Sequence, residues 1–182
     1  YILSRHPERF PRAAASMYAV FDLGASFYWI LPTAPPWYAV AEAEGGGVDS
    51  AWRGPRETDG GVTVRRMMAE YGEYVWRDRW GALYSVFGGN PLAAMPSLHF
   101  ATSLMAALLL LEVGPIPGAL GFSYALMLGF SLVYLGEHYV VDLLGGAALT
   151  AAVRRLAPRA EGWAARAGRA VSRLEEMAHE AI

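Results

Sequence analysis

Four apolar runs, each close to the length that crosses a lipid bilayer, constrain this chain more than any other feature of its sequence. They are Ala13 to Leu31, Ser97 to Val113, Gly118 to Gly136 and Tyr139 to Val153. A membrane-spanning helix needs about 20 mostly apolar residues. A helix of a soluble protein has a polar face, and none of these runs sustains one. The sequence therefore predicts an all-α integral membrane protein built as a transmembrane helix bundle with four spans.

The composition agrees with a membrane protein and limits its partners. Of the 182 residues, 54% are hydrophobic and 18% are charged, so the chain is more apolar than ordinary soluble domains. The net charge of -2 argues against a nucleic-acid partner, and the absence of cysteine excludes disulfides and thiolate metal sites. We therefore expect membrane lipids as partners and no nucleic acid. The sequence leaves the oligomeric state open.

A segment of about 65 residues separates the first two runs, which is far longer than an ordinary connection. It begins with PTAPPWY, whose prolines end the preceding helix, and continues through EAEGGGVDSAWRGPRETDGG, a pattern typical of a surface loop. From Val64 to Val75, apolar and aromatic residues recur at helical spacing. This spacing predicts short interfacial helices within a long extracytoplasmic loop. Loops of this kind often carry function.

The placement of arginine predicts the orientation. One group precedes the first run and another follows the fourth: Arg5, Arg9, Arg12, Arg154, Arg155 and Arg159. Cytoplasmic ends are enriched in arginine, and four crossings return the chain to its starting side, so both groups are expected in the cytoplasm. We expect residues 1–157 to form the membrane domain, in a bacterial plasma membrane with its site facing outward. Residues 158–182 are expected to form a cytoplasmic amphipathic tail.

Two histidines stand at the predicted outer ends of apolar helices. His99 lies in NPLAAMPSLHF, and His138 lies in YLGEHYVVDLLGG, where Asp142 follows it by four residues. This spacing places His138 and Asp142 on one helix face, so the carboxylate can hold one ring proton while the other nitrogen attacks a substrate. His99 has no carboxylate so near in sequence and suits the donation of a proton to a leaving group. The structural alternative is an interfacial polar role for each histidine, but an aspartate inside a bilayer is costly unless it is paired.

A metal centre is a weaker alternative for the same residues. His99, His138 and Asp142 could hold a cation, but a further ligand would be needed and none is evident in the sequence. We therefore expect no metal and no cofactor.

The same motifs carry a family resemblance. AAMPSLHFA followed by SLVYLGEHYVVDLLGG resembles the second and third signature motifs of the type-2 phosphatidic acid phosphatase superfamily, P-S-x-H and S-R-x5-H-x3-D. With APPWY, the resemblance extends to the branch of fungal inositol phosphorylceramide synthase and its bacterial relatives. It implies that Ser97 contacts the phosphate and that His99 is the general acid. It also implies that His138 attacks phosphorus to give a phosphohistidine, with Asp142 orienting its ring.

Two departures from the family pattern concern the phosphate. Leu132 stands where the phosphatases have arginine, and the first motif, K-x6-R-P, has no match. A phosphate in a dry site requires cationic donors, so arginines of the long loop are expected to replace the missing ones. Arg66 is the first candidate, and Arg77 and Arg79 are the next. The superfamily usually has six membrane helices, so we expect two more upstream.

These inferences together predict an enzyme that acts on a lipid phosphate without a metal. It hydrolyses or transfers the phosphoryl group through a phosphohistidine intermediate at the outer membrane face. The enzymatic alternative is a phosphotransferase that moves a polar headgroup phosphate, of the inositol phosphate type, onto a lipid alcohol. The non-enzymatic alternative is a lipid-binding membrane scaffold.

Overall fold

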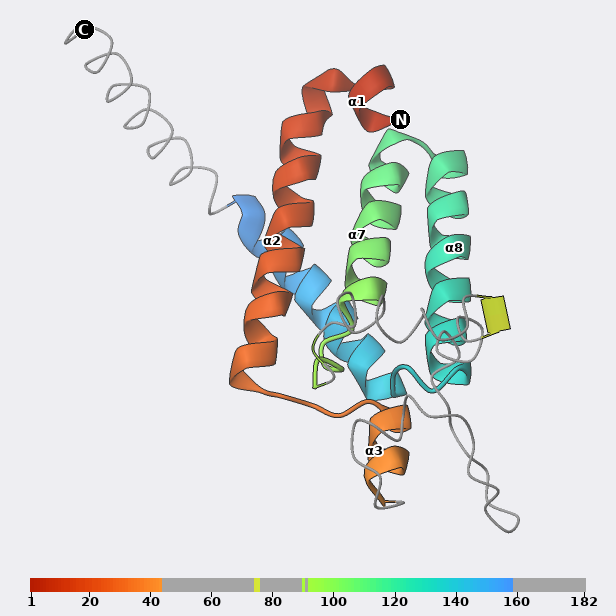
Figure 1. Ribbon diagram of the computed structural model, residues 1–182. Helices are drawn as coiled ribbons and strands as arrows, with labels where there is room; N and C mark the ends of the chain where they lie inside the picture. Colours follow the sequence, from red (N-terminus) through yellow and green to blue (C-terminus); the bar gives the residue numbers. More distant parts are fainter. Residues whose placement is uncertain (44–73, 76–89, 91, 159–182) are drawn as a thin grey trace, which may run out of the picture.

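The computed structural model describes residues 1–43, 74–75, 90 and 92–158 (Figure 1), and every contact below belongs to this part of the chain. Its helices are α1 (Ile2–Arg5), the 3-10 helix η1 (Pro7–Arg9), α2 (Phe10–Ile30), α3 (Pro36–Ala43), α7 (Leu98–Val113) and α8 (Pro115–Tyr134). A last helix covers residues 140–158. Between these helices the described ranges contain an isolated parallel bridge, Thr33 to Ala93, but no strand. The all-α prediction is therefore confirmed.

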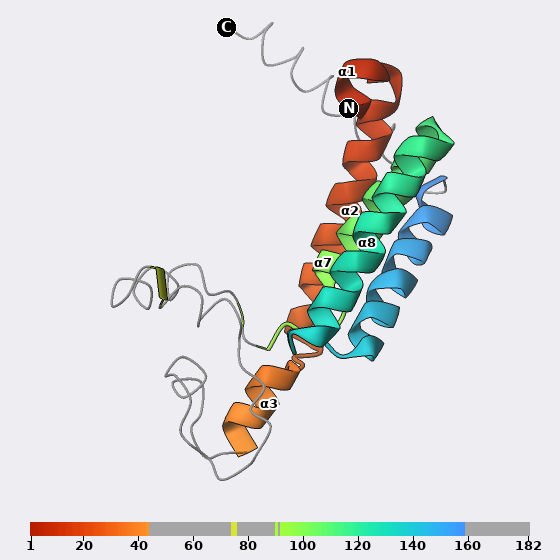
Figure 2. The ribbon, with the colours of Figure 1, turned by 90° about the vertical axis from the view of Figure 1, so that its right-hand side faces the viewer.

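Each of the four apolar runs forms a helix. The runs correspond to α2, α7, α8 and the last helix, and these four lie side by side in a bundle (Figure 2). Gly114 alone separates α7 from α8, so the two helices must run antiparallel. At the other end of α8, Gly136 has a positive φ of 70° and turns the chain toward the last helix.

The core lies between α2, α7 and the last helix. Each of these helices contributes apolar side chains to it: Ala13, Val20, Ala101, Met105, Leu109, Leu149 and Val153. The buried hydroxyl of Thr150 donates to the carbonyl of Ala101 at 3.0 Å and so joins the last helix to α7. It also reaches the Gly146 carbonyl at 3.0 Å in its own helix. A buried hydroxyl that finds such acceptors does not destabilise the core.

The outer face of α8 is covered by large apolar side chains. They recur at helical spacing and are at least 61% exposed: Ile116, Leu120, Tyr124, Met127, Phe130 and Tyr134. Contiguous exposed apolar surface of this kind marks a contact with lipid or with another helix. Within the described residues, α8 is the helix that is long and apolar enough to cross a membrane by length and composition, and α7 is a shorter apolar helix. The prediction of four spans is thus supported for one helix and stays a prediction for the others.

The long segment after α2 contains a helix that the sequence analysis missed. The prolines of PTAPPWY do end α2, which stops at Ile30, but Pro36 then begins α3. Proline is favoured at the first position of a helix because its missing N–H has no partner to lose there. Tyr74 and Val75 are helical. The rest of the predicted interfacial helices, with Arg66, Arg77 and Arg79, lies outside the described residues, as does the tail from residue 159 onward.

Close packing of α8 on α7 predicts the effect of adding one methyl group. A Cβ at Gly121 would lie 2.8 Å from the Cα of Ala107, a backbone atom that cannot move alone. We expect Gly121→Ala to destabilise the bundle by about 1–3 kcal/mol, on the scale of overpacking. Gly114→Ala is the control, because its Cβ would meet only Pro117 Cδ at an ordinary 3.6 Å. Thermal unfolding in detergent measures both, and an unchanged Tm for Gly121→Ala would contradict the packing described.

Candidate active site

Asp142 lies at the start of the last helix and has two structural contacts there. The helix begins at residue 140, so Tyr139 is the N-cap and Asp142 is the third helical residue. Its Oδ2 accepts a hydrogen bond from the Tyr139 N–H at 2.8 Å, which is the acidic half of a capping box. Its backbone carbonyl accepts from the N–H of Ser97 at 3.0 Å. The carboxylate is therefore held in one orientation by its own helix.

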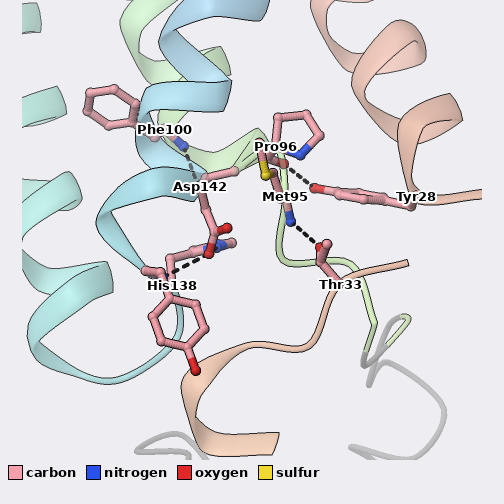
Figure 3. A network of polar contacts seen from close by, with 9 residues as sticks. Tyr28, Thr33, Met95, Pro96, Phe100, His138 and Asp142 are labelled. Carbon is pink, nitrogen blue, oxygen red and sulfur yellow. Dashed lines mark hydrogen bonds and ion pairs between the residues drawn. The ribbon is translucent and has the colours of Figure 1, made fainter. Parts of the chain in front are cut away.

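His138 faces this carboxylate. Its Nδ1 lies 3.5 Å from Oδ2 of Asp142, and the two side chains are 8% and 3% exposed (Figure 3). The separation is longer than the roughly 2.7–2.9 Å of a strong charge-assisted hydrogen bond, and Nδ1 makes no hydrogen bond within the described structure. The prediction that both side chains lie on one helix face is wrong, because the helix begins at residue 140 and His138 precedes it. The two side chains nevertheless lie close together and buried, and the roles proposed for them stay predictions.

His99 meets His138 from the neighbouring helix. It lies in the first turn of α7, and its ring centroid is 6.3 Å from that of His138, with 60° between the ring planes. Unlike His138, His99 is exposed. The structure thus brings together two residues that are far apart in the sequence and gives them different environments, as a separate nucleophile and acid require.

Ser97 begins the helix that carries His99. Its side chain is fully buried, and its Oγ accepts from the Phe100 N–H at 3.4 Å, so it serves as the N-cap of α7. A Cβ at Gly146 would lie 2.7 Å from the Ser97 carbonyl oxygen, which shows how closely the last helix approaches this turn. The structure gives Ser97 a capping role, and its expected contact with phosphate stays a prediction.

The surroundings of His138 determine its protonation. The residue lies between α8 and the last helix, and burial is the largest influence on its pKa, which it lowers. The nearby carboxylate of Asp142 and a hydrogen bond with the Ala94 backbone oppose this effect, whereas the charge of His99 adds to it. The net pKa lies below the ordinary 6.5. His138 is therefore neutral at neutral pH, which is the state a nucleophilic nitrogen requires.

The phosphate-binding part of the predicted site cannot be placed within the described residues. The arginines proposed to hold phosphate, Arg66, Arg77 and Arg79, lie outside the described residues, so their roles stay predictions. Leu132 contributes its backbone carbonyl, which accepts from the N–H of His138 at 3.1 Å. Among the described residues, no group of three or more histidine, cysteine, aspartate or glutamate side chains is placed to hold a metal ion.

The opposite end of the bundle carries arginines. Nη1 of Arg9 donates to the Glu112 carbonyl at 2.5 Å, and Nη2 of Arg154 lies 2.6 Å from Glu112 Oε1. Glu112 is in the last turn of α7, whereas His99 is in its first turn. Arg9 and Arg154, one from each arginine group, therefore meet at one end and the histidines at the other, as the predicted topology requires. Which membrane face each end occupies stays a prediction.

Sequence analysis also missed the loop that borders His138. Residues 92–97 run beside the end of α2, and Thr33 contacts them through a short parallel bridge that no periodicity signals. The N–H of Trp37, in α3, donates to the Gly136 carbonyl at 3.2 Å and so ties the missed helix to the turn before His138. The proline pair at the start of α3 was the available signal for this helix.

Two histidines and an aspartate gathered at one end of a helical bundle suit phosphoryl transfer, and comparison with known proteins identifies the family. A family model described as the PAP2 superfamily matches residues 1–156. The chain therefore belongs to the PAP2 superfamily, the phosphatidic acid phosphatase type-2 group that its motifs resemble, and the predicted family is confirmed.

Three curated relatives are inositol phosphorylceramide synthases of fungi. The catalytic subunit of Schizosaccharomyces pombe is 32% identical over 126 residues, covering 69% of this chain and 27% of the relative. The Candida albicans protein is 31% identical over 131 residues, covering 72% and 26%. The catalytic subunit of Saccharomyces cerevisiae is 31% identical over 121 residues, covering 66% and 27%. The chain thus spans about a quarter of the length of these relatives. No solved structure matches it.

The lowered pKa of His138 predicts a pH dependence of stability. Between the folded pKa and the ordinary 6.5, the unfolded chain binds more protons than the folded chain, so the free energy of unfolding falls as the pH falls through this window. We expect the wild-type Tm to drop more from about pH 7.5 to about pH 5.5 than the Tm of His138→Gln, which has no proton to bind there. Thermal unfolding of both proteins tests this, and equal drops would show that burial does not disfavour the charged ring.

Proposed function

We propose that this chain carries the phosphoryl-transfer site of a membrane enzyme that moves a polar headgroup phosphate, of the inositol phosphate type, from a lipid donor onto a lipid alcohol. The observation that carries the proposal is the pair of histidine rings 6.3 Å apart, with Asp142 3.5 Å from one of them. The names of the three relatives favour transfer over hydrolysis. Hydrolysis is the same chemistry with water as the acceptor.

In the first step, Nε2 of His138 attacks the phosphorus of the donor. A P–N bond forms, the P–O bond to the donor's lipid alcohol breaks, and protonated His99 gives its proton to the departing oxygen. The proton on Nδ1 of His138 turns to Asp142, which stabilises the positive charge that the ring acquires. The hydrogen bond with the Ala94 backbone raises the pKa of His138, so a ring N–H donates it. Before the attack this bond is given up and the ring proton moves to Nδ1, beside Asp142, which leaves the lone pair of Nε2 free to face phosphorus. The headgroup phosphate is then held on His138.

In the second step, the hydroxyl of the acceptor lipid attacks the same phosphorus. His99, now neutral, takes the hydroxyl proton as the new P–O bond forms and the P–N bond breaks. His138 returns to its neutral form and His99 to its protonated form, so the site is ready for another donor. The exposure of His99 suits this role, because the leaving and entering oxygens must both reach it.

Donors for the phosphate oxygens are available at the first turn of α7. The N–H group of His99 precedes the first helical hydrogen bonds, and a helix N-terminus favours an anion. The Ser97 hydroxyl accepts from Phe100, which leaves its own proton free to donate. Guanidinium groups complete the charge balance in this proposal, with Arg66 as the first candidate and Arg77 and Arg79 as the next.

The proposed setting is a membrane whose outer face carries the site. The exposed apolar face of α8 supports burial in lipid, and the arginines around Glu112 support a cytoplasmic position for the opposite end. A site at the membrane surface allows both lipids to present their polar ends to His99 and His138 while their chains stay in the bilayer.

Trapping the covalent intermediate tests the roles of His138 and Asp142. With a donor labelled in its headgroup phosphate, we expect acid-labile label on wild-type protein and none on His138→Ala, because the attacking nitrogen is gone. Asp142→Asn should keep a residual rate, lower by about a hundredfold or more, because the nucleophile remains but its orienting charge is lost. Quenched-flow labelling measures both. Normal labelling of His138→Ala would overturn the mechanism.

Dependence on the acceptor separates transfer from hydrolysis. In detergent micelles with a labelled phospholipid donor, we expect turnover to require a long-chain alcohol such as ceramide, with label appearing in a new lipid and little free headgroup phosphate. The products are separated by chromatography, and His138→Ala is the matched blank. Full turnover without the alcohol, with water-soluble product only, would assign the site to a phosphatase and refute the transferase proposal.

A further inference from the structure

A short loop lies between the end of α2 and the two histidines. It covers residues 92–97, and its last residue is the N-cap of the helix that carries His99. On one side it touches α2 and the residues that follow it, and on the other side it touches His138 and Asp142 (Figure 3). Its position therefore affects the nucleophile and the acid at once.

Two side chains hold the loop from the α2 side. The Tyr28 hydroxyl donates to the carbonyl of Pro96 at 2.8 Å, and the Thr33 Oγ1 accepts from the N–H of Met95 at 2.7 Å. The backbone of Thr33 adds two bonds, donating to the Leu92 carbonyl at 2.9 Å and accepting from the Ala94 N–H at 3.1 Å. Tyr28 and Thr33 thus hydrogen-bond with loop residues on both sides of Ala94 and with Ala94 itself.

The opposite side of the loop borders the reacting groups. Ala94 is 2% exposed and its backbone hydrogen-bonds with the ring of His138. The N–H of Ser97 donates to the Asp142 carbonyl at 3.0 Å. The loop is therefore clamped between α2 on one side and the start of the last helix on the other. A shift of the loop would move His99 and release His138 from Ala94 in the same step.

We propose that Thr33 and Tyr28 are positioning residues, which act through the loop 92–97 to set the two histidine rings against each other. The proposal rests on the proposed function, since the rings are positioned for the phosphoryl transfer described above. Neither side chain is assigned a chemical step: Thr33 bonds to Met95, and Tyr28 bonds to Pro96 and to the Leu98 backbone, with the charge of Asp142 nearby. Their effect is on the geometry of nucleophile and acid, for which small displacements are costly.

Thr33→Val tests the proposal most sharply, because it keeps the shape of the side chain and removes the acceptor of the Met95 N–H. We expect kcat to fall at least about tenfold with KM changed less than about threefold, since the loss is in the alignment of the reacting groups. Thr33→Ser keeps Oγ and should restore most of the rate. Thr102→Val is the matched control, because the Thr102 hydroxyl bonds to the carbonyls of Leu98 and His99 within its own helix.

Two further readouts separate positioning from a general loss of structure. Loss of the Ala94 contact removes a bond that raises the pKa of His138, while Asp142 and His99, the other titratable groups that act on the ring, remain. A displaced loop also exposes the ring, and burial is the largest influence on this pKa, so the acid limb of kcat/KM should move to higher pH in Thr33→Val, with Tm near that of Thr102→Val. Tyr28→Phe should act in the same direction, and the double variant should cost less than the product of the single effects, because both side chains hold one loop.

Carbethoxylation of the histidines gives a readout that does not depend on the proposed reaction. The buried His138 should react slowly with diethyl pyrocarbonate in wild-type protein and in Thr102→Val, and faster in Thr33→Val, as measured by peptide mass spectrometry. If the wild-type protein catalysed neither transfer nor hydrolysis, but His138 still reacted faster in Thr33→Val than in wild type, the proposed function would be refuted. The role of Thr33 in holding the loop would then stand. If Thr33→Val had the same kinetics, pH profile and diethyl pyrocarbonate reactivity as the wild-type protein, the positioning role would be refuted.

Discussion

The position of Asp142 is the constraint on which the site depends. Its carboxylate caps the last helix through the Tyr139 N–H, its carbonyl holds the N–H of Ser97, and its Oδ2 lies 3.5 Å from His138. One residue therefore joins the start of a helix, the turn that begins α7 and the proposed nucleophile. A buried carboxylate is costly unless its oxygens have partners, and here those partners are also the parts of the site.

The two ends of the bundle carry different kinds of side chain. Antiparallel helices return the chain to each end in turn, so residues far apart in the sequence gather there. α2 ends and α7 begins at the level of His138, while Arg9 and Arg154 meet Glu112 at the far end. Reactive groups thus collect at one end and permanent charges at the other. In a membrane this separation places polar chemistry near one surface without a charged residue crossing the apolar middle of α8.

Much of the site could be inferred from spacing. The i,i+4 relation of His138 and Asp142 predicts their approach, and the P-S-x-H motif predicts a histidine at the start of α7. The family match confirms the class that these motifs indicate. The difference in exposure between His99 and His138 could not be inferred in this way. It depends on which neighbours pack around each ring, and those neighbours come from other helices.

The sequence by itself determined the four long helices but not α3, because apolar runs of sufficient length and their bordering prolines and glycines are local signals. It also predicted that His138 and Asp142 lie close together, although His138 precedes the helix that begins at residue 140. Only the tertiary structure decided that Thr33 and Tyr28 hold the loop before Ser97, and that Ala94 touches His138. The hydrogen bonds of Thr33 and Tyr28 join residues 62 and 68 positions apart through backbone groups of the loop. Backbone hydrogen bonds leave no mark in the choice of side chain at the accepting position.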